Sequence, residues 1–385
     1  MSEQQPDWDP RSEAVLKDQL AAYDTTRRSC PVARSKHGYT SLLKHEDVLR
    51  ALLDHDTYSN VVSRFPSVPN GMDPPEHTPF RRLIEPYFNA RRMREFEPVV
   101  RSEARSLVAA LPEGEIELMA QFAQVFALRI QCAFMGWPHS LHEPLHEWTQ
   151  KNRAATLAAD PDAMARVAAE FDAHVKALLA HRRLDGNGSA DDVTSRLLRE
   201  RVNGRPLAED EIVSIIRNWT VGELGTLAAS VGILAHFLAE HPDVQALLRA
   251  EPGLLPAAID EILRIHGPLV MNRRRVTRPV QVRGRNLQPG ERVALNWVSA
   301  NRDEEVFGDP DEFRLDRDPS LNLLYGAGIH ICPGAPLARL ELRVLMEELL
   351  SGTQHIALAA DAIVIKAHYP SSGFSSLPLT LRKFG

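Results

Sequence analysis

Apolar and polar positions along the chain favour helices in its middle and short strands towards its ends. Apolar residues recur at helical spacing over most of residues 77–265. After residue 268, short apolar runs bounded by glycine and proline indicate strands. The runs at 280–282, 292–295 and 363–365 are of this kind, and breaks between helices are expected at 112–114, 136–138 and 185–191.

The first part of the chain mixes the two patterns. Residues 38–43 are strand-like and lead into a helical run at 45–53, and a proline-rich loop follows at 61–76. The chain is expected to end in a hairpin over 370–379. Because no repeat or long linker interrupts the pattern, we expect one domain over residues 1–385, mainly α with small β-sheets. Its helix-rich part is 77–265 and its sheet-rich parts are 30–76 and 268–385.

Composition is that of an ordinary soluble globular protein. Hydrophobic residues make up 44% and charged residues 25%, with a net charge of −6, so no basic excess favours nucleic acid. The three cysteines form no closely spaced pair, which argues against a disulfide framework or a structural zinc site. The N-terminal residues are polar and lack the apolar core of a signal peptide or membrane span. We therefore expect a cytoplasmic protein that binds no membrane.

A glycine-rich turn holds one of these cysteines, Cys332, directly ahead of an amphipathic run at 335–350. Gly326, Gly328 and Gly334 would allow positive φ and the close approach of a flat ligand. A thiol at a helix N-terminus is favoured as its thiolate, the form that binds metal. The alternative is a small apolar residue in a turn. A hydrolase nucleophile is disfavoured, because His330 lies only two residues away and catalytic Cys and His residues usually meet through the fold.

The turn resembles the haem-binding signature of the cytochrome P450 family, Phe-Gly-x-Gly-x-His-x-Cys-x-Gly. Here residues 325–334 read Tyr-Gly-Ala-Gly-Ile-His-Ile-Cys-Pro-Gly, and Leu-Ala-Arg follows at 337–339. The resemblance covers residues 30 to 379 and implies a triangular helical prism, with haem b between a long distal helix and the cysteine loop. It makes Cys332 the thiolate ligand of the iron. It also assigns cofactor contacts to Tyr325, Gly326, His330 and Gly334.

The same resemblance implies cations for the two haem propionates. His77 and Arg81 are one helical turn apart and match the family's His-x-x-x-Arg helix, although surface pairs of this kind are usually just solvated. Arg274 matches a propionate-binding arginine on a strand, whose alternation sends Arg273 and Arg275 to the other face. Glu261-x-x-Arg264 resembles the family's structural ion pair, and Arg317 is expected to add a charge to that network.

The distal helix, expected over 211–240, departs from the family pattern Ala/Gly-Gly-x-Asp/Glu-Thr. Thr226 matches the threonine, but Gly225 replaces the acid and Glu223 occupies a position that is normally glycine. We interpret Glu223 and Thr226 as a relocated acid and alcohol pair that handles protons. The alternative is a structural salt bridge from Glu223 to Arg217. Each of the two glycines of this turn costs about 1 kcal/mol relative to alanine, which predicts local widening or a close approach.

Family positions that contact substrate are mostly apolar here, which favours a small hydrophobic or aromatic substrate. They are Val221, Leu224, Val270, Met271 and Phe374. Arginines that could gather near Cys332 as a basic patch for an acidic ferredoxin are Arg91, Arg92, Arg94, Arg339 and Arg343.

The resemblance implies a monooxygenase that uses O2 to hydroxylate or oxidatively dealkylate its substrate. No flavin or ferredoxin module is evident in this chain, so electrons would come from a separate ferredoxin and ferredoxin reductase. Two alternatives remain open: a peroxide-driven peroxygenase, in which Glu223 would act on peroxide, and a non-enzymatic haem protein that binds a gas or another ligand.

Overall fold

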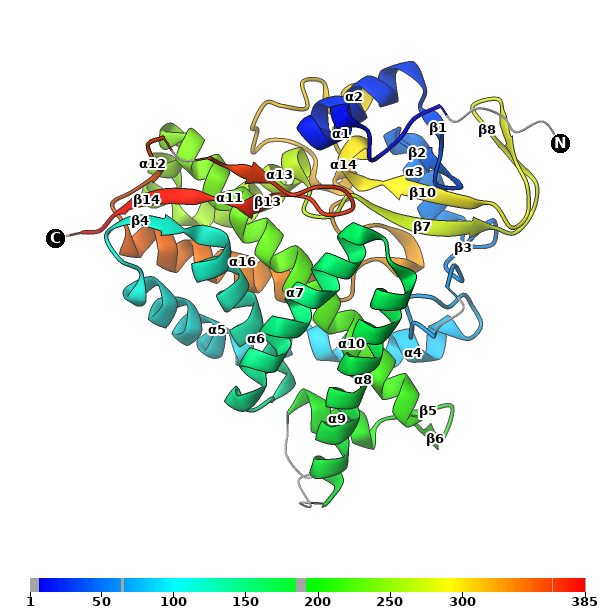
Figure 1. The fold of residues 1–385 in the computed structure, drawn as a ribbon, viewed down its shortest axis with the longest axis horizontal. Coiled ribbons are helices and arrows are strands. Elements are labelled where there is room, and N and C mark those ends of the chain that lie inside the picture. Colours follow the sequence, from blue (N-terminus) through cyan, green and yellow to red (C-terminus); the bar gives the residue numbers. More distant parts are fainter. Residues whose placement is uncertain (1–6, 64–65, 185–191, 362, 385) are drawn as a thin grey trace.

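The structure is a computed structural model that describes residues 7–63, 66–184, 192–361 and 363–384. The break predicted at 185–191 lies outside these residues. Helices dominate the fold, and most of the strands lie in the upper part of Figure 1, whereas the short strands β5 (Arg201–Val202) and β6 (Arg205–Pro206) lie at its lower right. The prediction of a mainly helical chain with small sheets is confirmed.

The helices of the first half include the predicted run at 45–53. They are α1 (Glu13–Lys17), α2 (Gln19–Ser29), α3 (His45–Leu53), α4 (His77–Ile84), α5 (Ala90–Ala110), α6 (Gln124–Met135), α7 (His142–Ala158), α8 (Pro161–Leu184) and α9 (Val193–Arg199). The second half contains α10 (Glu209–Gly222), α11 (Ala228–Glu240), α12 (Pro242–Ala250), α13 (Leu255–His266), α14 (Trp297–Ala300), α15 (Glu304–Phe307) and α16 (Ala335–Gly352).

The largest sheet described brings together the two sheet-rich parts of the chain. Its strand order is β1 (Val32–Ser35), β2 (Tyr39–Leu42), β10 (Arg292–Asn296), β7 (Met271–Val276) and β3 (Tyr58–Ser59). β2 and β10 run parallel, and the other neighbours run antiparallel. On β7, Arg274 is buried while Arg273 and Arg275 are exposed, so the predicted alternation is confirmed.

Smaller sheets lie at the C-terminus and in the loops. A three-stranded sheet has the order β11 (His355–Leu358), β14 (Pro378–Arg382), β4 (Gly114–Glu117). The two-stranded pairs are β12 (Ile365–Lys366) with β13 (Phe374–Ser376), β5 (Arg201–Val202) with β6 (Arg205–Pro206), and β8 (Val280–Val282) with β9 (Arg285–Leu287).

A hairpin with Pro370 in its connection is present, but its strands lie at 365–366 and 374–376 and not within the predicted range 370–379. β13 pairs with β12, whereas β14 pairs with β11 and β4. The chain changes sheets at Leu377, whose side chain is fully buried and whose N–H donates to Glu117 Oε1 at 2.8 Å. This anchor directs the following strand away from β13.

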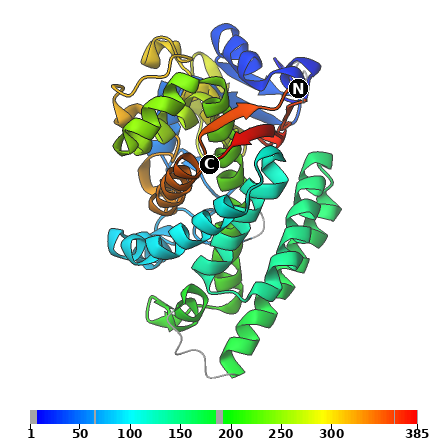
Figure 2. The same cartoon turned by 90° about the vertical axis from the view of Figure 1, so that its left-hand side faces the viewer.

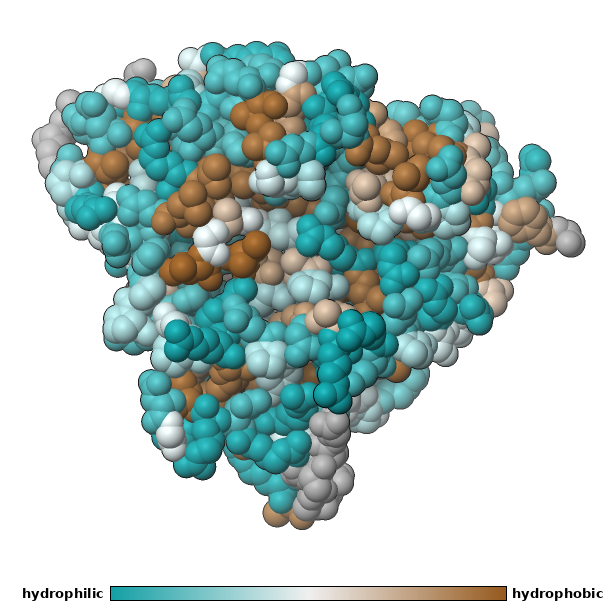
Figure 3. Space-filling view, turned by 180° about the vertical axis from the view of Figure 1, so that it is seen from behind, coloured by the Kyte–Doolittle hydropathy of each residue, from teal (hydrophilic) through white to brown (hydrophobic). Residues whose placement is uncertain are grey.

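A central helix runs diagonally through the molecule in Figure 1, formed by α10, the π-helical turn η5 (Glu223–Leu227) and α11. The widened turn lies where the paired glycines predicted it, and that prediction is confirmed. The helix Glu209–Glu240 is long and apolar enough to cross a membrane, but 61% of its most apolar window is buried inside the protein. It is a core helix. The outer face in Figure 3 is largely hydrophilic, with separate apolar patches.

α16 connects the cysteine loop to the rest of the core. It packs along α5, as Figure 2 shows with α16 in brown and α5 in cyan, and it also contacts α13 and η5. The helix that follows Cys332 therefore contacts the widened turn of the central helix.

A buried ion network braces the segment ahead of the cysteine loop. Arg264 Nε donates to Glu261 Oε2 at 2.7 Å, and the Arg264 guanidinium also donates to the carbonyls of Asn301 and Pro310 at 2.8 and 3.0 Å. Arg317 Nε donates to Glu261 Oε1 at 2.9 Å. The predicted pair and the predicted role of Arg317 are confirmed.

Candidate haem site

The cysteine loop depends on two glycines in left-handed conformation. Gly326 has φ +76° and Gly328 has φ +69°. A Cβ on Gly328 would lie 2.6 Å from the carbonyl oxygen of Leu52, so a side chain there would force the backbone to shift. Gly334 was expected to share this conformation, but its φ is −81°, so that expectation is wrong. A Cβ on Gly334 would stand 3.9 Å from Cys332 Sγ, which is an ordinary van der Waals contact, so the space beside the thiol could also hold a small side chain.

Cys332 lies deep in the protein yet faces open space. Burial raises the pKa of its thiol, while the backbone N–H groups of Gly334 and Ala335 and the charge of Arg81 lower it. Even so, the residue is exposed. These two facts agree only if the side chain borders an internal space. The backbone N–H groups at the start of α16 are placed to stabilise a thiolate there.

The central helix exposes a stripe of residues in the middle of the core. Val221 is 45% exposed, and Gly222 and Gly225 are exposed as well, whereas Leu224 on the same turn is buried. A Cβ added to either glycine would meet nothing within 4 Å. Thr226 is half-buried on this turn, and its hydroxyl donates to the Gly222 carbonyl.

This stripe and the cysteine loop lie near one another. The negative charge of Glu223, on the same turn, acts on the Cys332 thiol and raises its pKa. The loop and the widened turn are thus close enough to interact, and both expose surface in the interior. We take them to border the same space.

Cationic and donor groups from three elements gather beside the loop. His77 is 3% exposed, and its ring centroid lies 4.4 Å from that of His330. Burial lowers the pKa of His330 to about 3, helped by the charges of His77 and Arg274, and Nε2 of His330 is buried without a hydrogen-bond partner. Burial also lowers the pKa of Arg274, which is 5% exposed, to about 10. Such a group of donors suits an anion.

Arg81 has a second role besides its position near this group. Its Nη1 donates to the carbonyl of Ile331 at 2.6 Å, and its Nε pairs with Glu85 at 2.9 Å. Ile331 directly precedes Cys332 in the chain. The guanidinium therefore ties α4 to the cysteine loop.

Tyr325 and Arg339 brace the other side of the loop. The Arg339 guanidinium lies 4.4 Å from the Tyr325 ring centroid and pairs with Asp260 of α13 at 2.9 Å. The Tyr325 carbonyl accepts from the Cys332 N–H at 2.8 Å. Burial raises the pKa of the Tyr325 hydroxyl. This tyrosine is thus part of the loop's framework.

The predicted substrate-contact residues differ in their surroundings. Val221 is exposed, Met271 and Phe374 are half-buried, and Leu224 is buried. Phe374 stacks on His236 with ring centroids 4.5 Å apart. Val270 is fully buried in a small core cluster with Tyr23 and Tyr369, so its side chain lies in the core.

The arginines of the predicted basic patch are largely compensated by acids. Arg91 pairs with Glu95 at 2.8 Å, and Arg343 pairs with Glu97 at 2.8 Å. Arg339 pairs with Asp260, as described above. These three do not form a group of free positive charges.

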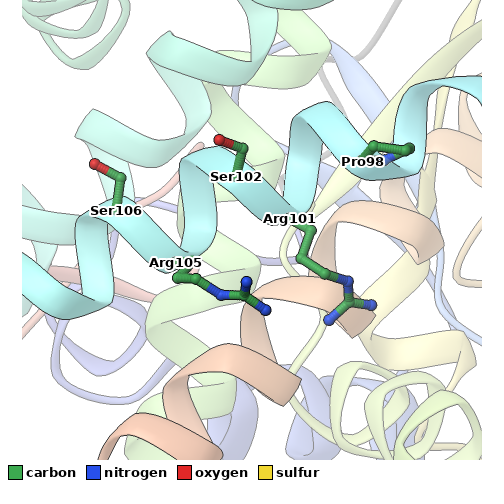
Figure 4. A pocket seen from close by; sticks show the side chains of 5 residues that line it. All are labelled: Pro98, Arg101, Ser102, Arg105 and Ser106. Carbon is green, nitrogen blue, oxygen red and sulfur yellow. The ribbon is translucent and has the colours of Figure 1, made fainter.

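A surface hollow on α5 is not part of this site. Arg101 and Arg105 extend from α5 towards α16, and Ser102 and Ser106 point to the other side (Figure 4). Both arginines bond to Glu348 of α16. The hollow contains none of the loop residues.

Glu223 does not contact Arg217, and that alternative interpretation is wrong. Arg217 makes two hydrogen bonds to Asp172, of 2.9 and 2.7 Å. Glu223 instead faces Glu341 of α16, a fully buried residue that the sequence analysis missed. Its signal was an acid within an apolar helical stripe, flanked by Leu337 and Leu345 at i−4 and i+4.

These features fit haem. Among the described residues, no three His, Cys, Asp or Glu side chains are grouped to hold a bare metal ion. A metal bound by Cys332 would therefore need its other ligands from a cofactor. An open space beside the thiol and nearby donors that have no carboxylate partner meet both requirements of a haem with its propionates.

Comparison with known proteins gives the family. The Cytochrome P450 family model matches residues 160–356. The chain is 32% identical over 321 residues to cyclomarin C epoxidase CymV of Salinispora arenicola, covering 80% of this chain and 81% of the relative. It is 31% identical over 354 residues to erythromycin C-12 hydroxylase of Saccharopolyspora erythraea, covering 87% and 88%. A solved mutant of P450 EryK with erythromycin B gives a TM-score of 0.87 at 29% identity, covering 95% and 96%.

The chain belongs to the cytochrome P450 family. It has the P450 fold, and its cofactor is a haem whose iron is bound by a cysteine thiolate. It is an oxidoreductase of the monooxygenase type, as are relatives named as hydroxylases, such as the vitamin D(3) 25-hydroxylase of Pseudonocardia autotrophica, 30% identical over 358 residues and covering 88% of this chain and 87% of the relative.

Proposed function

We propose that this P450 hydroxylates or oxidatively dealkylates a small hydrophobic or aromatic substrate in the cytoplasm. The observation that carries the proposal is the Cys332 thiol, which borders open interior space at the start of α16. The exposed stripe of Val221, Gly222 and Gly225 supports an apolar substrate space along the central helix. The similar erythromycin C-12 hydroxylase and vitamin D(3) 25-hydroxylase support hydroxylation of an organic molecule.

Bound haem supplies the oxygen-activating chemistry, and the thiolate of Cys332 holds its iron. His77, Arg274 and His330 would bind the propionates, because they offer donors beside the loop without a carboxylate partner. Arg81 would hold the loop through the Ile331 carbonyl. Tyr325, Gly326 and Gly334 shape the loop around the thiol.

Thr226 is proposed to orient water beside the widened turn. Its hydroxyl donates to the Gly222 carbonyl within the widened turn, which leaves its lone pairs free to accept from water. Met271 and Phe374 would border the substrate. Glu223 would supply protons, a role developed in the next subsection.

Electrons are proposed to come from a separate ferredoxin and its reductase. Because several arginines near the cysteine loop are paired with acids, such a partner would have to recognise a mixed surface. The second candidate is peroxide-driven oxidation, favoured by an acid, Glu223, on the turn that faces the open space.

Turnover separates these two candidates. Haem-loaded protein with NADPH, a ferredoxin, a ferredoxin reductase and a panel of hydrophobic compounds should give products that incorporate one atom of labelled O2. Products that form with peroxide alone and incorporate oxygen from it would support the peroxygenase. Haem binding without any product in either assay would contradict both and leave a ligand-binding protein.

A further inference from the structure

Two carboxyl groups meet in the core beside the cofactor site. Glu341 is 0% exposed, and both of its carboxyl oxygens are buried without a conventional donor. Oε1 of Glu223 is buried in the same way. Glu223 lies in the widened turn η5, and Glu341 lies in α16, which packs against that turn.

The two side chains are hydrogen-bonded to each other. Two carboxylates can only accept hydrogen bonds, so this contact exists only when one of the pair is protonated. The Glu223 Oε1 atom and both carboxyl oxygens of Glu341 have no N–H or hydroxyl donor from another residue, so a proton within the pair is what can satisfy them. Burial raises the pKa of both groups, as expected for acids in a site of low polarity.

No cation among the described residues acts on the pair to offset its charge. Facing it from the cysteine loop are Cys332, whose pKa Glu223 raises, and Tyr325, whose pKa Glu341 raises. On α6, Gln131 donates to Thr220 at 2.8 Å and makes no bond to either acid.

The charged side chains on the elements around Glu223 and Glu341 form their bonds with other residues. These are Arg129 with Glu103, Arg101 with Glu347 and Glu348, Arg343 with Glu97, Arg339 with Asp260, Arg264 with Glu261, His236 with Glu240, Arg81 with Glu85, and Arg249 with the carbonyls of Leu350 and Thr353.

We propose that Glu223 and Glu341 share a single proton, and that Glu341 is a positioning residue which keeps Glu223 protonated beside the cofactor space. The inference rests on the proposed function for its purpose, because a proton held on the distal turn is useful where oxygen is reduced. The missing acid at Gly225 is then replaced by a pair that spans two helices. Glu223 gives up its proton through water near Thr226, and a proton from solvent restores the pair.

Infrared difference spectroscopy of the haem-loaded protein tests the shared proton. Near neutral pH the wild type should show one C=O band of a protonated carboxylic acid that shifts in D2O. The band should vanish in both Glu223→Gln and Glu341→Gln, because an amide donor lets the remaining acid ionise. Glu347→Gln is the matched control, since Glu347 also lies on α16 but pairs with Arg101 and Arg343, and it should retain the band.

No such band in the wild type, or an unchanged band in both variants, would overturn the proposal. If the glutamine variants do not fold, titration of the wild type decides instead, because the band must disappear as pH rises. Glu341→Asp should restore the band and part of the rate. The positioning role further requires Glu341→Gln to lower kcat and alter its pH profile more than it changes KM, and equal changes in both would contradict that role.

Measurements on the same samples distinguish a failure of the shared proton from a failure of the proposed function. A carbon monoxide spectrum reports the haem-thiolate site independently of the carboxyl band. Absence of the thiolate spectrum would refute the proposed function whatever the infrared result. A normal spectrum with no carboxyl band would refute only the shared proton.

Discussion

The cysteine loop and the widened turn of the central helix lie near one another but are specified in different ways. The backbone course of the loop is set by its own residues, since Gly326 and Gly328 take positive φ and the following helix supplies N–H groups to the thiol, and Arg81 then ties the loop to α4. The widened turn depends on a distant partner, because Glu223 meets Glu341 from another helix. Local sequence can therefore specify a metal ligand more fully than it specifies a proton path.

The largest effect is expected from the network that supports the cysteine loop. Arg264→Ala should leave Glu261 with fewer partners in a buried site and lower the free energy of unfolding by about 3–5 kcal/mol. Arg314→Ala is the matched control, because Arg314 forms an exposed pair with Asp316. Chemical denaturation should show little change for the control. Equal losses in both variants would refute the bracing role of Arg264.

A smaller loss is expected from the loop itself. Gly328→Ala forces a side chain into left-handed backbone and against the Leu52 carbonyl, and should cost about 1–3 kcal/mol or displace the loop. Gly284→Ala is the matched control, because Gly284 has a similar φ of +80° and a Cβ added there would meet nothing within 4 Å. The difference between the two variants in stability and haem retention isolates the contact with Leu52. No difference would mean that the contact does not constrain the loop.

The smallest effect is a change in the pH dependence of stability. The pKa of Glu223 and that of Glu341 are raised in the folded protein above an ordinary value of 4.5. The pair thus holds a proton in the folded state that the unfolded state releases. The stabilisation that this proton gives is complete below pH 4.5 and is lost as the pH rises through the pKa of the folded protein. Glu341→Gln should flatten this fall in unfolding free energy. An unchanged slope would contradict the protonated pair.

Much of the fold and the proximal site could be predicted because their signals are local. The spacing of apolar residues marked the central helix, and the glycines around Cys332 marked the loop. The pair Gly222 and Gly225 indicated the widened turn, since glycine weakens a regular helix.

Other features depend on tertiary contacts and could not be read in this way. Glu341 lies far from Glu223 in the sequence, and nothing local shows that two acids will be buried together. The fully buried Val270 and the separation of β13 from β14 have the same origin, because both reflect packing against segments distant in the chain.

The reduced-minus-oxidised carbon monoxide difference spectrum of the purified protein, beside that of Cys332→Ala, tests the central claim most directly. We expect a thiolate-type Soret band in the wild type that is lost in the variant, because Cys332 is the thiol that borders the open space. Cys132→Ala is the control, since that thiol is buried in the core and its loss should leave the band in place. Failure of the wild type to take up haem, or the same band in Cys332→Ala, would contradict the account.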